Sequence, residues 1–430
     1  MIAAMLMSHY ARWIVYLGGS VEDVGWIMGG GAMAAFLLRP IAGSCIDRMG
    51  ARSAWLLGLL VFLAALLANL SIHEIDAGIY AARAFLLVGA GLVFSSGMTL
   101  VTHNSPQHRR TEAIGMFGAS GFVAMFAGPM IGDVILGAGQ RSRTDFHTLF
   151  YVSAVAVALS ATLLLRIRDR KPGHGESPVH FSAAIKSVWR YWPGAITLVS
   201  FAFGMFLTVP FVFLVSYVDD LQLRTAFLSP VGLFFLGYGG WGFVVRLGLR
   251  RVPDRLGRRK VLLAGLTLNS VGLFCFLAIG PDSSWMILLP GVLCGSGHAL
   301  CNPTINALIL DHFPDHFRGM GCTLSLMIVD SGAILGAPLL GMIAERTGYA
   351  GMFITAGCVA LAAMLYLWWN TVPIWRARRE EAIRAASTIA TISEPFKVLR
   401  PGSGERTPSI EGDAQLLDDS AQRFAVPVDQ

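Results

Sequence analysis

A single aspartate lies deep within a long apolar stretch of the chain. Asp330 stands about eleven residues from each end of the run Gly319–Ile343, so in a membrane-spanning helix it would lie near the bilayer midplane. A charged side chain there costs about 2.5–3.5 kcal/mol, so it must pair, face water or carry a proton. Asp330 is therefore a candidate for proton coupling or ligand binding. The alternative is a neutral or hydrogen-bonded acid that pins its helix to a neighbour.

Another apolar run, Trp285–Leu310, carries polar residues at helical spacing. Residues at i, i+4, i+7 and i+8 share one face of a helix, and here they are Cys294, His298, Cys301 and Asn302, with Asn306 continuing the face. The pattern predicts a polar cavity lining, with interhelical hydrogen bonding as the alternative. A soft-metal path along these groups is the least favoured interpretation. No zinc-type spacing occurs, and we predict neither a metal site nor a cofactor.

A charged motif occurs twice. Asp47-Arg48-Met49-Gly50 with Arg52 returns 207 residues later as Asp254-Arg255-Leu256-Gly257 with Arg259. An arginine lies eight residues upstream of each copy, at Arg39 and Arg246. A charged turn repeated at one place in two apolar halves indicates an internal duplication. Duplicated helical halves in a membrane are typical of secondary transporters.

The composition agrees with a membrane location. The 430 residues are 54% hydrophobic and 14% charged, with a mean hydropathy of +0.60, whereas soluble domains carry roughly 25% charged residues. Lipid takes the place of water around such a surface. The net charge of +6 comes from loops that mark topology, so we predict no nucleic-acid partner.

Apolar runs of about 20 residues are long enough to span a bilayer as helices. Eleven such runs predict an all-α polytopic membrane protein: Val24–Pro40, Ala54–Ser71, Tyr80–Val101, Ala113–Leu136, Leu149–Leu165, Gly194–Val218, Leu228–Val245, Val261–Gly280, Trp285–Leu310, Gly319–Ile343 and Gly351–Trp369. Met1–Leu17 is a twelfth, short candidate. Because Met1–Val15 spans only about 22 Å as a helix, we expect its helix to begin before Met1.

Basic residues concentrate in alternate loops, chiefly 46–53, 166–193 and 246–260. By the positive-inside rule these loops face the cytoplasm, which predicts an inner-membrane protein with both termini inside. We expect four parts: a six-helix bundle over 1–165, a cytoplasmic loop over 166–193, a second six-helix bundle over 194–372 and a largely disordered tail over 373–430.

These motifs resemble those of the major facilitator superfamily. Gly43-x-x-x-Asp47-Arg48-x-Gly50-x-Arg52 is similar to its signature between the second and third helices. Gly128-Pro129-x-x-Gly132 resembles its antiporter motif in the fifth helix, with Asp133 in place of a second glycine, and Ala337-Pro338-x-x-Gly341 repeats it 209 residues on. The segment from Asp330 to Gly341 is similar to the eleventh helix of bacterial sugar-efflux-like and drug-efflux-like members.

The resemblance implies a cytoplasmic latch in which a carboxylate at the end of the second helix pairs with an arginine and holds the halves closed. Arg109 or Arg110 is the candidate partner for Asp47, and Arg318 lies near Asp254 by the duplication. Gly50 and Gly257 permit the tight turns. The alternative is that these charges only enforce topology.

Arg83 resembles the arginine of the family's fourth helix, which implies proton relay; more simply, it snorkels toward Glu74 or Asp76. We predict a carrier, and no enzyme, that works by alternating access, is a monomer, and moves a small organic solute by proton-coupled efflux. The alternatives are a proton-symport importer of a sugar or organic acid, and a non-transporting membrane sensor on the same fold.

Overall fold

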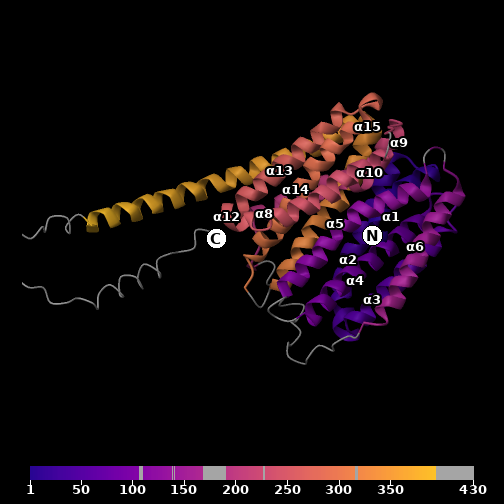
Figure 1. The fold of residues 1–430 in the computed structure, drawn as a ribbon, viewed down its shortest axis with the longest axis horizontal. Helices are drawn as coiled ribbons and strands as arrows, with labels where there is room; N and C mark the ends of the chain where they lie inside the picture. Colours follow the sequence, from indigo (N-terminus) through magenta and orange to yellow (C-terminus); the bar gives the residue numbers. More distant parts are fainter. Residues whose placement is uncertain are drawn as a thin grey trace, which may run out of the picture.

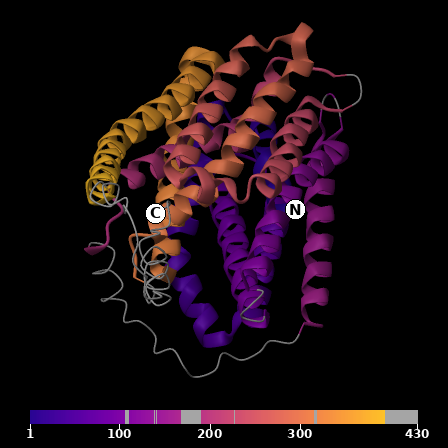
Figure 2. The ribbon, with the colours of Figure 1, turned by 60° about the vertical axis from the view of Figure 1, so that its left-hand side comes forward.

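The computed structural model describes residues 1–105, 110–137, 139, 141–167, 190–225, 228–314 and 318–393, and helices are the only regular elements in these ranges. Helices of the first half gather on one side of the ribbon and those of the second half on the other (Figures 1 and 2). This arrangement confirms the predicted all-helical membrane fold.

Six helices form the first half of the chain: α1 (Ile2–Tyr16), α2 (Val21–Met49), α3 (Ala51–Asn69), α4 (Ala77–Asn104), α5 (Arg110–Leu136) and α6 (Arg143–Leu164). Two of these helices begin at residues whose side chains cap the first turn. Ser20 and Asp23 form a capping box at α2, as Ser142 and Asp145 do at α6, so backbone N–H groups of the first turn gain partners.

The second half contains α8 (Ala195–Thr208), the π-helix η2 (Val209–Phe213), α9 (Leu214–Asp220), α10 (Pro230–Phe235), the π-helix η3 (Leu236–Trp241), α11 (Gly242–Gly248), α12 (Val252–Leu256), α13 (Arg258–Cys275), η4 (Phe276–Ala278), η5 (Pro281–Ile287), α14 (Leu288–Leu310) and α15 (Arg318–Ser393). The segments α8–η2–α9 and α10–η3–α11 each form one continuous span. A π-helical turn widens the helix locally and often marks a functional position.

Ten helices in the described residues are long and apolar enough to cross a membrane. They cover the eleven predicted runs because α15 contains two of them, joined at Gly348, where φ is +75°. Since α1 has only 15 residues, it is about 22 Å long. Met1, the N-cap of α1, lies beside Gly128 of α5.

Glycines bring the two halves into backbone contact at two places. A Cβ atom on Gly25 or Gly29 of α2 would meet Ala337 or Pro338 of α15, and one on Gly239 of η3 would meet Phe126 of α5. Small residues allow this approach between membrane helices, where van der Waals packing takes the place of the hydrophobic effect. The Ala337-Pro338-x-x-Gly341 motif of the run Gly319–Ile343 therefore contributes to the contact between the halves.

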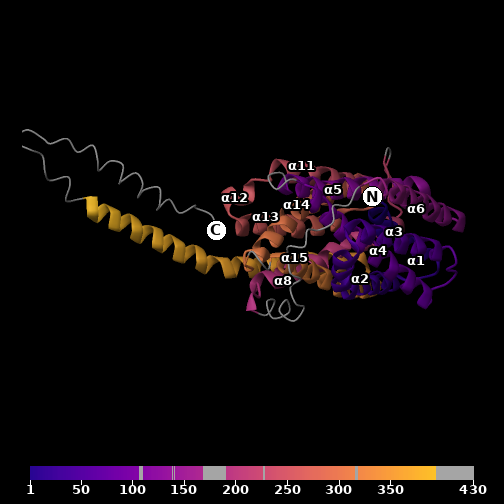
Figure 3. The same cartoon turned by 90° about the horizontal axis from the view of Figure 1, so that it is seen from below.

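The predicted boundary of the tail at residue 373 is not where the last helix ends. The backbone of α15 stays helical through Ser393 and extends away from the bundle (Figures 1 and 3). The sequence after Pro373 is rich in Ala, Arg and Glu, which are strong helix formers. Residues 394–430 lie outside the described ranges.

The contact between α8 and α15 generates a stability prediction. A Cβ on Gly332 would collide with the carbonyl oxygen of Phe201, whereas one on Gly91 of α4 would meet no atom within 4 Å. We expect Gly332→Ala to destabilise the protein by about 1–3 kcal/mol, because the two backbones must move apart. Gly91→Ala is the matched control and should be neutral or stabilising by up to about 1 kcal/mol. Thermal unfolding in detergent checks both; equal midpoints would contradict the packing argument.

Candidate functional site

The bundle has two ends. The repeated charged motif lies at two turns, Gly50 between α2 and α3 and Gly257 between α12 and α13. We call this end of the bundle the basic end. The opposite end, where loops join α1 to α2 and α5 to α6, is called the far end.

At the far end, Asp219 of α9 receives two arginines. Arg12 of α1 donates from Nε to Oδ2 at 2.8 Å and from Nη2 to Oδ1 at 2.9 Å, a bidentate arrangement. Arg141, from the loop before α6, donates to the same two oxygens at 2.9 and 3.2 Å. Both arginines belong to the first half and the carboxylate to the second, so these bonds join the halves.

A second carboxylate completes this far-end cluster. Asp133 of α5 accepts from Nη1 of Arg12 and from the hydroxyl of Ser229, which caps α10 in the second half. Arg12 is only 6% exposed, and a buried charge persists only when well paired. Asp133, which stands where the antiporter motif has a second glycine, therefore connects that motif to the far-end cluster.

His9 links this cluster to the Gly-Pro motif. Its Nε2 lies 2.8 Å from the carbonyl oxygen of Pro129, and its Nδ1 lies 3.0 Å from Nη1 of Arg12. A carbonyl oxygen only accepts and a guanidinium only donates, so Nε2 carries the hydrogen and Nδ1 accepts. The fully buried imidazole is thus held as the neutral tautomer between α1 and α5.

Asp330 has a partner in the other half. Nε of Arg39, from α2, donates to Oδ2 of Asp330 at 2.7 Å, and Nη2 of Arg39 also contacts that oxygen. The two side chains are 26% and 29% exposed. The sequence singled out Asp330 but not this partner. The available signal was that Arg39 is the only basic residue within its apolar run.

The polar residues of α14 form a hydrogen-bonded chain across three segments. Tyr238 of η3 contacts Nδ1 of His298 at 2.7 Å, and Asn302 reaches Nε2 at 3.3 Å. Asn306 donates to Asn302 at 2.9 Å and accepts from Ser325 of α15 at 2.5 Å. Asn302 and Asn306 are half-buried. The geometry shows the interhelical hydrogen bonding that was the alternative interpretation, and the polar cavity lining stays a prediction.

The two cysteines of the predicted face are not part of this chain of hydrogen bonds. Cys294 and Cys301 instead approach Asn269 of α13, with sulfur-to-oxygen and nitrogen-to-sulfur distances of 3.9 and 3.8 Å. The described residues contain no group of three His, Cys, Asp or Glu side chains able to hold a metal ion.

Arg83 does not snorkel toward Glu74 or Asp76. It is 2% exposed, and its guanidinium carbon lies 4.9 Å from the ring centre of Tyr10 on α1. The hydroxyl of Tyr10 donates to Asn69 at 2.8 Å. A cation over an aromatic face is favourable when desolvated. The Arg83 side chain therefore lies inside the first half, over the Tyr10 ring, and does not reach the carboxylates of Glu74 and Asp76.

The latch is described only in part. Gly50 and Gly257 have φ of +83° and +89°, at equivalent helix-to-helix turns, and Arg52 donates to the carbonyl oxygen of Leu165. Arg48, Asp254 and Arg255 are exposed, Arg259 is half-buried, and Arg258 pairs with Asp311 within the second half. Gly43 lies within α2. Arg109 and the side chains of Asp47, Arg110 and Arg318 lie outside the described part of the chain, so the Asp47 pairing stays a prediction.

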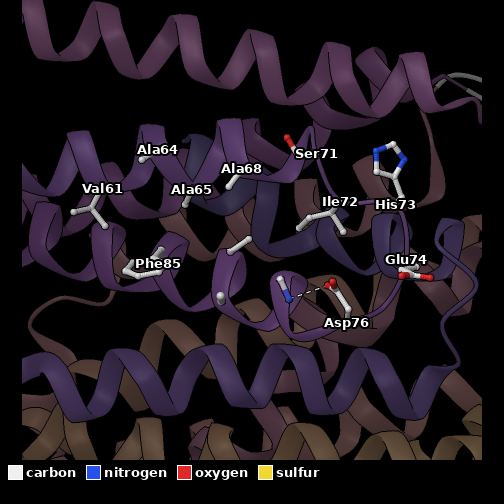
Figure 4. Close-up of a pocket in the computed structure, with 13 residues that line it drawn as sticks. Val61, Ala64, Ala65, Ala68, Ser71, Ile72, His73, Glu74, Asp76 and Phe85 are labelled. Carbon is white, nitrogen blue, oxygen red and sulfur yellow. Dashed lines mark hydrogen bonds between the residues drawn. The ribbon is translucent and has the colours of Figure 1, made fainter.

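Two cavities lie away from Asp330. One, of about 690 Å³, is a groove between α3 and α4 with Val61 and Phe85 along its wall and His73, Glu74 and Asp76 at its mouth (Figure 4). The other, of about 510 Å³, covers the far-end cluster and takes its walls from both halves, including Arg12, Asp219 and Tyr349.

Comparisons with known proteins agree with this architecture. A family model described as Major Facilitator Superfamily matches residues 1–253 and 247–403. The Staphylopine export protein of Staphylococcus aureus is 23% identical over 81% of this chain and 87% of its own length. Sugar efflux transporter A of Dickeya chrysanthemi is 31% identical, but that match covers 36% of this chain and 42% of the relative.

Solved structures share the fold at low sequence identity. A D-xylose-proton symporter superposes with a TM-score of 0.69 at 14% identity, covering 85% of this chain and 93% of the symporter. A POT family transporter gives 0.68 at 17% identity, covering 87% and 93%. With the duplicated motif, the paired helical halves and the family match over most of its length, this chain belongs to the Major Facilitator Superfamily and is a multi-pass membrane transporter of small molecules.

Proposed function

We propose that this transporter exports a small organic solute in exchange for protons, with its halves rocking in alternating access. The observation that carries the proposal is the ion pair between Arg39 and Asp330, which joins the two halves within their membrane spans. A pair of this kind responds to protonation, because a neutral Asp330 no longer attracts the guanidinium.

The state of the pair fits one step of such a cycle. With Asp330 bound to Arg39, the carboxylate acts as an anion and its proton has left. Protonation frees Arg39 and removes one connection between α2 and α15. Each proton taken up thereby weakens the contact that opposes separation of the halves, which couples the gradient to the conformational change.

The far-end cluster acts as the opposite gate in this proposal. We assign the basic end to the cytoplasm of a bacterial cell, with the chain working as a monomer in the inner membrane and both termini inside. The halves are then joined on the outer side through Asp219, Asp133 and Ser229, and through the backbone N–H of Val21, which donates to Glu345 at 3.1 Å. Asp47 and Asp254 would close the inner side in the other state.

The export direction is supported by the relatives. Sugar efflux, staphylopine export and quinolone resistance appear in the names of similar proteins. Import by proton symport is the second candidate, since a structural neighbour is a proton symporter; at 14% identity that likeness concerns the fold alone.

Asp330→Asn tests the coupling. In inverted membrane vesicles with an acidic interior, reported by a pH-quenched acridine dye, quinolones and sugars are added one at a time. Antiport releases protons and restores fluorescence, whereas symport deepens the quenching. We expect Asp330→Asn to reduce the response at least tenfold at equal amounts in the membrane. Asp220→Asn, an exposed acid of α9, is the control. An undiminished response in Asp330→Asn removes this residue from the mechanism.

Asp219→Asn tests the outer gate. The change leaves Arg12 and Arg141 without their shared carboxylate, and a buried pair that loses one partner is strongly destabilised. We expect backbone hydrogen exchange in residues 214–220 to rise at least tenfold. Asp220→Asn changes the neighbouring carboxylate and should leave exchange as in the parent protein. Equal exchange in the two variants would show that the cluster does not hold the far end closed.

A further inference from the structure

The internal duplication places two arginines at equivalent positions. Arg39 and Arg246 are 207 residues apart and lie within the spans Val21–Arg39 and Pro230–Gly248. Each continues the helix face that carries the contact glycines. Arg39 follows Gly25 by fourteen residues of α-helix, close to a whole number of turns, and Arg246 follows Gly239 of η3 by seven residues. Both arginines point toward the opposite half of the molecule, Arg39 to α15 and Arg246 to α5.

Only one of the two positions supplies a carboxylate. Arg39 meets Asp330 of α15. The offset of 209 residues that relates Pro129 to Pro338 maps Asp330 onto Gly121 of α5, since 330 − 209 = 121. The contact of Arg39 with α15 thus has an aspartate at this position, whereas the contact of Arg246 with α5 has a glycine.

The structure leaves room at this position. Nη2 of Arg246 would lie 3.9 Å from a Cβ on Gly118, so the guanidinium reaches across to α5. Gly121 is one helical turn further along the same face, and a Cβ built on it meets no atom within 4 Å. Among the described residues, no carboxylate forms an ion pair with the half-buried Arg246.

Aromatic and polar groups border this space. Phe122, the residue after Gly121, packs in one apolar cluster with Val245, the residue before Arg246. Its ring meets the His298 ring edge to face, with centroids 5.6 Å apart. His298 begins the hydrogen-bonded chain that leads to the half-buried Asn302. A ligand between Gly121 and Arg246 would thus have a cation beside it and aromatic groups on neighbouring residues.

We infer that Arg246 and the open space at Gly121 form an anion-binding subsite that takes the carboxylate of an organic-acid substrate. An unpaired cation within a membrane span is costly, and the planar guanidinium matches a carboxylate with two parallel hydrogen bonds. The substrate carboxylate occupies the place that Asp330 fills in the other interface. The role in transport rests on the proposed function; binding itself does not.

Purified protein in detergent tests the subsite by thermal unfolding, without any proton gradient. The ligands are benzoate, gallate, citrate and glucuronate, each compared with its neutral amide. We expect at least one carboxylate to raise the midpoint and its amide to leave it unchanged. Because no gradient is used, binding can fail while pH-driven transport of other solutes persists, and coupling can fail while binding persists.

Variants of Gly121 separate charge from volume. Gly121→Asp supplies the missing acid within the chain, so it should weaken carboxylate binding at least tenfold more than the equally large Gly121→Asn, without lowering the unliganded midpoint. A tenfold change corresponds to about 1.4 kcal/mol. Arg246→Gln should abolish the carboxylate effect. Arg250→Gln, at an exposed arginine near the basic end, should retain it.

Four results would overturn the inference. They are stabilisation by no carboxylate of the panel, equal stabilisation by the amides, equal binding in Gly121→Asp and Gly121→Asn, and unchanged binding in Arg246→Gln. A lipid phosphate is the competing source of an anion. If phosphatidylglycerol alone produces the Arg246-dependent stabilisation, the position belongs to lipid and the substrate assignment is wrong.

Discussion

A charge inside a membrane bundle is costly unless another group compensates it, and in this transporter two arginines of the first half have their counter-charge in the second half. Arg12 pairs with Asp219, and Arg39 pairs with Asp330. Removing one partner of such a pair costs more than the pair itself contributes, so neither half can satisfy its charges alone. The association of the halves is therefore an electrostatic requirement as well as a packing one.

The repeat adds a geometric regularity to this requirement. Arg12 and Asp219 are 207 residues apart, the same offset that separates the two charged motifs. They are therefore equivalent positions in the two halves that meet each other, as expected close to an axis relating the repeats. At Asp330 and Gly121 the copies have instead diverged. The contact between α2 and α15 contains the acid Asp330, whereas the contact between α11 and α5 has open space at Gly121. The two contacts between the halves are therefore chemically different.

Much of the fold was predictable from the sequence because membrane spans need long apolar runs, and the runs marked by the repeated motif match the observed helices. Asp330 and the polar face of α14 were identifiable for the same reason: polar residues stand out in apolar surroundings. Their partners were not, since nothing in the spacing relates Arg39 to a residue 291 positions away. The far-end cluster was missed because Arg12 and Asp219 lie near the ends of their runs, where charges are ordinary.

The π-helical segments η2 and η3 both belong to the second half, whereas the described helices of the first half are α-helical throughout their spans. A widened turn has fewer well-aligned backbone hydrogen bonds and bends more readily than a regular helix. The two repeats are thus unequal in stiffness, although they share an origin. In the alternating-access cycle that we propose, the first half would therefore move as the stiffer block while the second half bends, so the two end states would not be mirror images.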